Sequence, residues 1–163
     1  MKYAFTLILS AILFGALLAQ AQQLPTKQVL PLNVAKRIAE AAETEAMKRG
    51  ATVVIAVVDD GGQLIALERL DDTQVASVDV AIGKARTAAI FRRPSKDFED
   101  QIKNGRVAAL ALPGATPLQG GIPIVSAGKV VGAIGVSGNT PQEDEDIAKA
   151  GAAAAAAAMQ ASR

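Results

Sequence analysis

The sequence predicts an α+β domain, with helices packed on a mostly antiparallel sheet of about five strands. Two turn signals carry this prediction. The first is Asp-Asp-Gly-Gly at residues 59–62, between the apolar run 52–58 and a second extended segment, 63–70. The second is Ala127-Gly128, between the β-branched runs 122–125 and 129–136. Short β-branched runs joined by such turns are typical of β-hairpins. Helical periodicity around both hairpins supplies the layer that packs on the sheet.

Three helices are predicted before the second hairpin. The first is capped by Asn33 and stopped by Gly50. The second ends before Pro94, and its apolar residues step by three and four: Val75, Val78, Ile82, Ala85 and Ala89. A glycine within this helix, Gly83, costs about 1 kcal/mol relative to alanine, so we expect a close packing contact there. Ser95 is predicted to cap a short third helix that runs through Lys103.

The rest of the chain is predicted to form a strand, an ordered loop, the second hairpin and a final helix. Residues 106–112 are predicted to be a further strand or extended segment. They lead into a glycine- and proline-rich loop that ends at Gly121, our first candidate for one wall of a site. After the hairpin, Thr140-Pro141-Gln142-Glu143 is a capping box with proline at the first helical position. An alanine run then extends this helix nearly to Arg163.

The first 21 residues have the pattern of a secretory signal peptide. Lys2 precedes an apolar stretch from Ala4 to Leu18, and Ala19-Gln20-Ala21 places small residues at a cleavage site. The alternative is a membrane anchor, but the apolar stretch is shorter than the ~20 residues that span a bilayer. We therefore expect a signal peptide over residues 1–21, a single domain over residues 22–163, and a periplasmic or secreted protein.

Composition excludes several classes of chemistry. The chain has no Cys, His or Trp, and Tyr3 lies in the predicted signal peptide. Disulfides, thiolate nucleophiles, histidine bases and zinc sites built on His or Cys are therefore excluded. Lys2 is one of 17 basic residues, so the predicted domain balances 16 basic against 16 acidic residues. A neutral domain with few aromatic residues is not expected to bind nucleic acid. Its many alanines favour a homo-oligomer that buries the remaining apolar faces.

Charged and hydroxyl residues each have a structural and a functional interpretation. Asp59 and Asp60 are favoured as turn residues over a cation site or an acid–base pair. Asp79 and Lys84, on the second helix, face a pocket or pair with neighbouring subunits, and the sequence does not choose. Thr116 is a turn residue or a weak oxygen ligand. The acidic and basic residues after the first hairpin are favoured as a solvated strand end over a metal site: Glu68, Arg69, Asp71 and Asp72.

Four blocks of sequence, in order and in register, resemble one known family. They are VVIAVVDDGGQLIALERLD, ASVDVAIGKARTAAIFRRPS, LPGATPLQGGIPIV and GKVVGAIGVSG. These blocks are similar to the GlcG/HbpS-like family, which includes the C-terminal domain of PduO-type proteins. The resemblance extends from about Leu32 to Ala158 and therefore covers nearly all of the predicted domain.

The resemblance implies a five-stranded antiparallel sheet and assembly into dimers to octamers. It also implies heme binding, because some members, including a secreted type linked to redox sensing beside a membrane sensor kinase, bind heme. Other members occur with genes for glycolate or propanediol utilisation. A threonine is implicated near the heme iron in the secreted type, and the matching block places Thr116 at that position.

One position departs from the family pattern. Many members have histidine after the two glycines of the first turn, whereas this chain has Gln63. Heme iron usually takes His, Cys, Met or Tyr, and the predicted domain offers only Met47 and Met159 among these. The resemblance further implies that basic side chains would pair with heme propionates, and the candidates are Lys84, Arg86 and Arg92.

The sequence thus leads to one function and two alternatives. The favoured function is that of a secreted or periplasmic oligomeric heme-binding protein, acting in storage, scavenging or redox sensing, with a membrane sensor as a candidate partner. The first alternative is an enzyme or accessory domain that acts on a small hydroxy acid or diol. The second is a structural or partner-binding oligomer. No acid–base pair in the sequence requires an enzyme.

Overall fold

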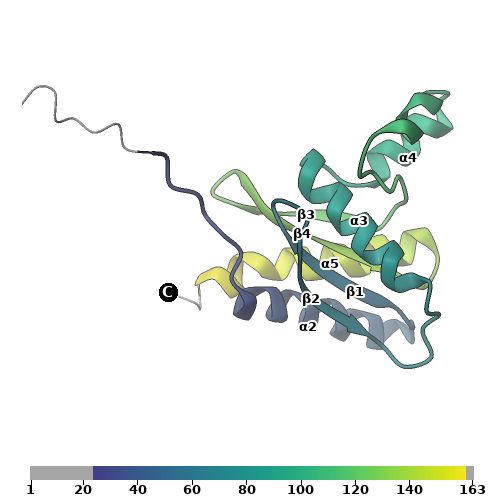
Figure 1. Cartoon of the computed structure of the whole chain (residues 1–163). Coiled ribbons are helices and arrows are strands. Elements are labelled where there is room, and N and C mark those ends of the chain that lie inside the picture. The colour runs from purple at the N-terminus through teal and green to yellow at the C-terminus, as the bar shows by residue number, and fades with distance from the viewer. Residues whose placement is uncertain (1–23, 161–163) are drawn as a thin grey trace, which may run out of the picture.

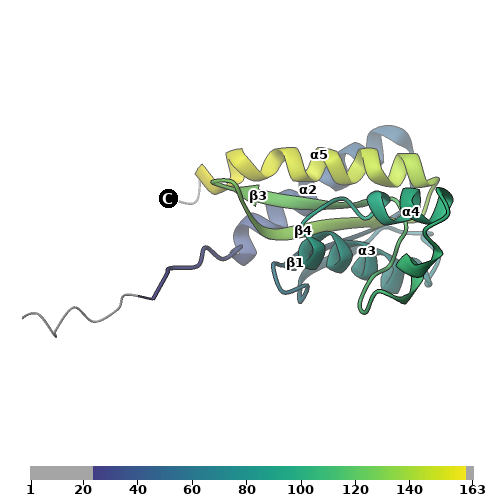
Figure 2. The ribbon, with the colours of Figure 1, turned by 90° about the horizontal axis from the view of Figure 1, so that it is seen from above.

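A computed structural model describes residues 24–160; the predicted signal peptide lies outside them. The described residues form an antiparallel sheet in the order β2-β1-β4-β3. Helices α2 and α5 pack on one face of this sheet and α3 packs on the other (Figures 1 and 2). The strands are β1 (Val54–Asp59), β2 (Leu64–Arg69), β3 (Gly121–Ser126) and β4 (Lys129–Ser137). The helices are α2 (Leu32–Arg49), α3 (Ser77–Phe91), α4 (Lys96–Lys103) and α5 (Pro141–Gln160).

The α+β class and both hairpins are confirmed, but the prediction of five strands is wrong. The described sheet has four strands. The segment predicted as a strand forms a short 3₁₀ helix instead, Val107–Ala111. Its backbone makes local bonds, from Ala109 N–H to the Arg106 carbonyl at 3.1 Å and from Leu112 N–H to the Ala109 carbonyl at 3.4 Å. These bonds pair backbone N–H and carbonyl groups within an alanine-rich segment, which lies beside α4 and away from the sheet (Figure 1).

The ends of the helices agree with the predictions except at two caps. Gly50 ends α2 in the left-handed conformation, with φ of 63°. At the start of α2, however, Pro31 and not Asn33 holds the N-cap position. The Ser95 hydroxyl makes no capping bond to α4; it donates to the Leu118 carbonyl and accepts from Gly121 N–H. The predicted capping contact of α5 is present, since Glu143 N–H donates to Thr140 Oγ1 at 3.3 Å.

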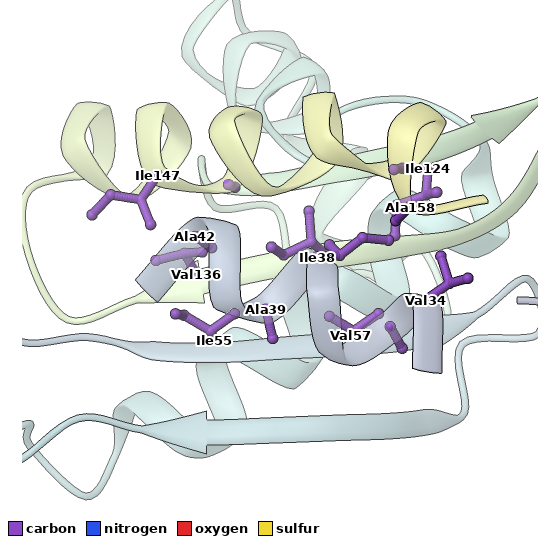
Figure 3. Packing of buried hydrophobic residues seen from close by; sticks show 14 of the residues in the cluster. Val34, Ile38, Ala39, Ala42, Ile55, Val57, Ile124, Val136, Ile147 and Ala158 are labelled. Atoms are coloured by element: carbon purple, nitrogen blue, oxygen red, sulfur yellow. The ribbon is translucent and has the colours of Figure 1, made fainter. Parts of the chain in front are cut away.

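The core has one layer on each face of the sheet. Between the sheet and the pair α2 and α5, large aliphatic side chains form one cluster, which includes Ile38, Ile55, Val57 and Ala158 (Figure 3). On the other face, small residues let α3 lie close to the strands, and these are mostly alanines: Ala56, Ala81, Ala85, Ala88, Ala89 and Ala133. The layer of α2 and α5 therefore stabilises the fold mainly through the apolar surface that it buries. The α3 layer stabilises the fold through close packing of small residues.

Two paired glycines fix how closely α3 approaches the sheet. Gly121 of β3 and Gly135 of β4 are cross-strand partners. A Cβ on Gly121 would overlap the Lys84 carbonyl, and a Cβ on Gly135 would overlap the Ala81 carbonyl. Because the α3 backbone rests on these two glycines, the opposite side of α3 is held at a fixed height above the sheet. That outer side carries the candidate site.

None of the helices within residues 24–160 combines the length and the apolar character that crossing a bilayer requires.

Candidate functional site

The glycine- and proline-rich loop at residues 112–120 (the Gly-Pro loop) lies directly against α3. Thr116 is the loop residue that contacts the helix. A Cβ on Gly83 would overlap Thr116 Oγ1 and lie 3.1 Å from Thr116 Cβ. The predicted need for a small residue inside this helix is therefore confirmed, and Thr116 is its cause. The Thr116 hydroxyl is half-buried and makes no hydrogen bond within the part of the chain that the structure describes.

A second threonine, Thr87, fixes the loop on the helix. Its buried hydroxyl donates to the Gly83 carbonyl at 2.8 Å and accepts from Thr116 N–H at 2.7 Å. The loop is thus tied to α3 one turn beyond the glycine on which Thr116 rests. Thr87 was not among the site residues predicted from the sequence. Its only sequence signal is its position four residues after Gly83, where a helical hydroxyl reaches the carbonyl one turn back.

Arg86 lies on the same outer face, between the loop and the β1–β2 turn. A Cβ on Gly62 of the turn would lie 2.7 Å from Arg86 Cγ, and a Cβ on Gly114 of the loop would lie 3.7 Å from Arg86 Nε. Ile90 flanks the same gap, with side-chain atoms 3.2 and 3.4 Å from those two positions. Arg86 is exposed, and its guanidinium has no hydrogen-bond or ion-pair partner among residues 24–160. The structure therefore brings together a free hydroxyl, a free guanidinium and an apolar side chain.

The acidic turn beside Arg86 is held by its own carboxylate. Asp59 Oδ1 accepts hydrogen bonds from Gly61 N–H at 2.9 Å and from Gln63 N–H at 2.8 Å. Asp60 instead forms an ion pair with Lys27 at 2.8 Å. In the described part of the chain, no group of three or more acidic residues could hold a metal ion. The hydrogen bonds of Asp59 and the ion pair of Asp60 support the structural interpretation of this turn. Its exposed Gln63 lies next to the glycine that contacts Arg86.

Lys84 lies elsewhere, in a buried ion pair that joins α3 to α5. Its ammonium donates to Asp144 Oδ2 at 2.8 Å and to the Val136 carbonyl at 2.9 Å, and both charged side chains are at most 4% exposed. Burial raises the pKa of Asp144, and the hydrogen bond and charge of Lys84 oppose that rise. Both partners of the Lys84 ammonium thus lie within the chain, and the buried side chain faces neither a surface pocket nor a neighbouring subunit. Asp79 is exposed in the first turn of α3, apart from it.

The two methionines lie with the helices on the opposite face of the sheet from Thr116. Met47 is 65% exposed on α2. Met159, near the end of α5, is half-buried against the larger core layer. Within one protomer, the structure therefore brings neither methionine to Thr116. Met159 instead lines two cavities of about 250 and 280 Å³ at the tip of the β3–β4 hairpin. Arg92 lies at a third cavity nearby.

Comparison with known proteins identifies the family. A family model described as "Haem degrading protein HbpS-like" matches residues 30–153. The chain belongs to this HbpS-like family. The resemblance that the four sequence blocks carry is therefore confirmed.

Individual relatives of this HbpS-like chain agree with that assignment. The GlcG protein of Escherichia coli K12 is 45% identical over 112 residues, which cover 69% of this chain and 84% of GlcG. A crystal structure of an HbpS double mutant from Streptomyces reticuli is 34% identical, with a TM-score of 0.75, and the match covers 83% of this chain and 92% of that one. A crystal structure of a PduOC:heme complex is 24% identical with a TM-score of 0.71, covering 78% and 95% of the two chains, and shows the shared fold.

Proposed function

We propose that this protein binds heme on the outer face of α3, with Thr116 at the iron and Arg86 at a propionate. The observation that carries the proposal is the juxtaposition of these two unpartnered groups on one face. The family description, which refers to haem, supports the choice of ligand. Bound heme would supply the redox-active iron, and storage, scavenging and redox sensing are the roles that this chemistry permits.

The chemistry of the face fits heme with weak axial ligation. A guanidinium suits a carboxylate such as a propionate, because its planar fork binds both oxygens. Ile90 offers apolar contact to the porphyrin edge. A threonine hydroxyl is a poorer iron ligand than histidine, thiolate or tyrosine. Heme would therefore be retained mainly by apolar contact and ion pairing, which suits exchangeable binding better than permanent incorporation.

A hemin titration followed by Soret absorbance tests the ligand and the site together. Saturable binding is expected for the wild-type protein. Thr116→Val keeps the shape of the side chain without the hydroxyl and should shift the Soret maximum of the complex. Arg86→Ala should weaken hemin binding. Lys36→Ala, an exposed cation on α2 across the sheet, is the matched control and should bind hemin as the wild type does. A wild-type protein that produces no saturable Soret change would rule out the proposal.

Secretion, assembly and a partner complete the proposed function. We propose that the protein lies in the periplasm or outside the cell, because residues 1–21 have the pattern of a secretory signal peptide. N-terminal sequencing of the protein recovered from the periplasm or medium should begin at Gln22.

The proposed homo-oligomer is tested by light scattering with and without hemin. We propose a membrane sensor as the partner. Co-purification from membranes with and without hemin tests whether the two proteins associate and whether hemin changes that association.

A second candidate is action on a small hydroxy acid, and the free guanidinium of Arg86 is the observation that favours it. Guanidinium groups also bind the carboxylates of small metabolites. Thermal-shift measurements with two- to four-carbon hydroxy acids should then stabilise the wild-type protein and not Arg86→Ala. Stabilisation by hemin alone would exclude this candidate. Stabilisation by a hydroxy acid without any Soret change would favour it over heme.

A further inference from the structure

We propose that a cavity at the opposite end of the sheet from α4 binds an amphipathic organic anion, a carboxylate or sulfonate carried on an apolar body. The cavity has a volume of about 980 Å³. It lies between the N-terminal segment 25–28, the tip of the β3–β4 hairpin and the end of α3. A volume of this size is at the upper end of the range for small-molecule sites.

The charges at the cavity are not balanced. Three basic side chains and one acidic side chain line it: Lys27, Arg92, Lys129 and Asp60. Lys27 and Asp60 neutralise each other in an ion pair of 2.8 Å. The side chains of Arg92 and Lys129 have no hydrogen-bond or ion-pair partner among the residues that the structure describes. Two uncompensated cations on one concave surface create a positive potential that concentrates anions.

The remaining wall of the cavity is apolar, which restricts the class of anion. Val125 is 53% exposed, and the exposed Ala127 and the half-buried Val130 extend the same wall. A small inorganic anion would neutralise the cations but leave these side chains in water. An anion with an apolar body would cover them as well, and removing apolar surface from water favours binding. The lining therefore favours an amphipathic ligand.

Two contacts hold the N-terminal segment in the position where it lines the cavity. Leu30 is buried against β4, where a Cβ on Gly132 would lie only 2.8 Å from Leu30 Cδ2. The Lys27–Asp60 ion pair then fastens the segment to the β1–β2 turn. Gly132 thus leaves room for Leu30 against the strand, and the ion pair fixes the segment at the wall of the cavity. The cavity shares no side chain with the face around Thr116 and Arg86, so the two proposals stand independently.

Fluorescence titration with 8-anilinonaphthalene-1-sulfonate tests the cavity, because this probe joins a sulfonate to aromatic rings. The wild-type protein should bind it saturably. The double variant Arg92→Ala, Lys129→Ala should bind it about tenfold more weakly, because it removes both cationic side chains that would pair with the sulfonate. The charge-preserving double variant Arg92→Lys, Lys129→Arg should retain most of the affinity. Lys36→Ala is the matched control and should bind as the wild type does.

Three outcomes are informative. Equal probe affinity in the wild type and the double alanine variant would overturn the proposal, because the probe would then report general apolar surface. Weak binding by the charge-preserving variant, with an unchanged melting temperature, would also overturn it, because charge would not be the property that matters. Unaltered probe binding in Thr116→Val and Arg86→Ala would support a site separate from the proposed heme face, whether or not hemin binds there.

Discussion

Gly83 and Thr116 pack against each other so closely that a methyl group on residue 83 would occupy the space of the Thr116 hydroxyl. This contact sets the position of the Gly-Pro loop on α3 and therefore the position of the hydroxyl proposed to face heme iron. Alanine at residue 83 would raise the helix propensity of α3 by about 1 kcal/mol but would displace the loop.

We predict that Gly83→Ala weakens hemin binding. We also predict that it does not raise the free energy of unfolding by the amount that the helix propensity of alanine implies. A double-mutant cycle with Thr116→Ala isolates the contact, because alanine at residue 116 removes Oγ1. In that background Gly83→Ala should destabilise the protein less than it does in the wild type, as measured by urea unfolding, because only the contact of 3.1 Å with the Cβ of residue 116 remains. Equal effects of Gly83→Ala in both backgrounds would show that the two residues are not coupled.

Thr87→Val should destabilise the protein because it leaves Thr116 N–H without its acceptor. The hydroxyl also donates to the Gly83 carbonyl, and Thr87 is fully buried. Loss of a buried partner costs about 1–3 kcal/mol. Thr87→Ser keeps the oxygen and should lose less of the free energy of unfolding. If serine and valine at this position unfold at the same urea concentration, the hydroxyl is not what holds the loop.

Breaking the Lys84–Asp144 ion pair should be the most damaging of these substitutions. Lys84→Met would leave the Asp144 carboxylate buried without its cation, and such a change costs about 3–5 kcal/mol. Adding Asp144→Leu should recover part of the loss, because no unpaired charge then remains. Arg49→Met, which removes an exposed partner of Glu45, is the control and should change the unfolding midpoint little. A loss in Lys84→Met no larger than that of the control would contradict the structural role of the pair.

Glu68 should make stability depend on pH. Its pKa is raised by burial first and then by the charges of Glu43 and Glu40, and its Oε2 atom is buried without a partner. Because the folded state holds the proton more tightly than the unfolded state, this group lowers stability as pH rises from the ordinary glutamate value of about 4.3 through the raised value.

Glu68→Gln should therefore raise the melting temperature at pH 7, and the gain should fade as pH falls toward 4. Glu43→Gln should give a smaller gain of the same sign, since it removes a neighbouring charge only. Melting curves of the three proteins from pH 4 to 8 make the comparison. A gain from Glu68→Gln that is the same at every pH would show that titration of Glu68 is not its source.

Turns and helix ends could be predicted from neighbouring residues in the sequence. Contacts between residues far apart in the sequence could not. The turn at residues 59–62 and Ala127-Gly128 located both hairpins, and Gly83 signalled a close contact without naming its partner. The segment before the Gly-Pro loop was misassigned because its alanines and leucines suit a strand or a short helix equally. Lys84 was predicted to face a pocket or a neighbouring subunit, because its partner, Asp144, lies 60 residues away in sequence.

The candidate site shows the same division. The family resemblance indicated Thr116 and Arg86, and the fold brings them to one face of α3. It also separates them from Met47 and Met159, since the two helices that carry these methionines pack on the other side of the sheet. A sequence does not show which face of the sheet each helix covers, and this placement decides which side chains can share one ligand.

The central claim, that heme lies over the outer face of α3, is tested most directly by paramagnetic broadening of amide signals. ¹H–¹⁵N spectra of the protein with ferric hemin and with diamagnetic zinc protoporphyrin differ only through proximity to the iron. The account predicts selective loss of the signals of Gly83, Arg86, Gly114 and Thr116 in the ferric complex. Selective loss at Val125, Gly128 and Met159 instead, with the α3 signals intact, would contradict it.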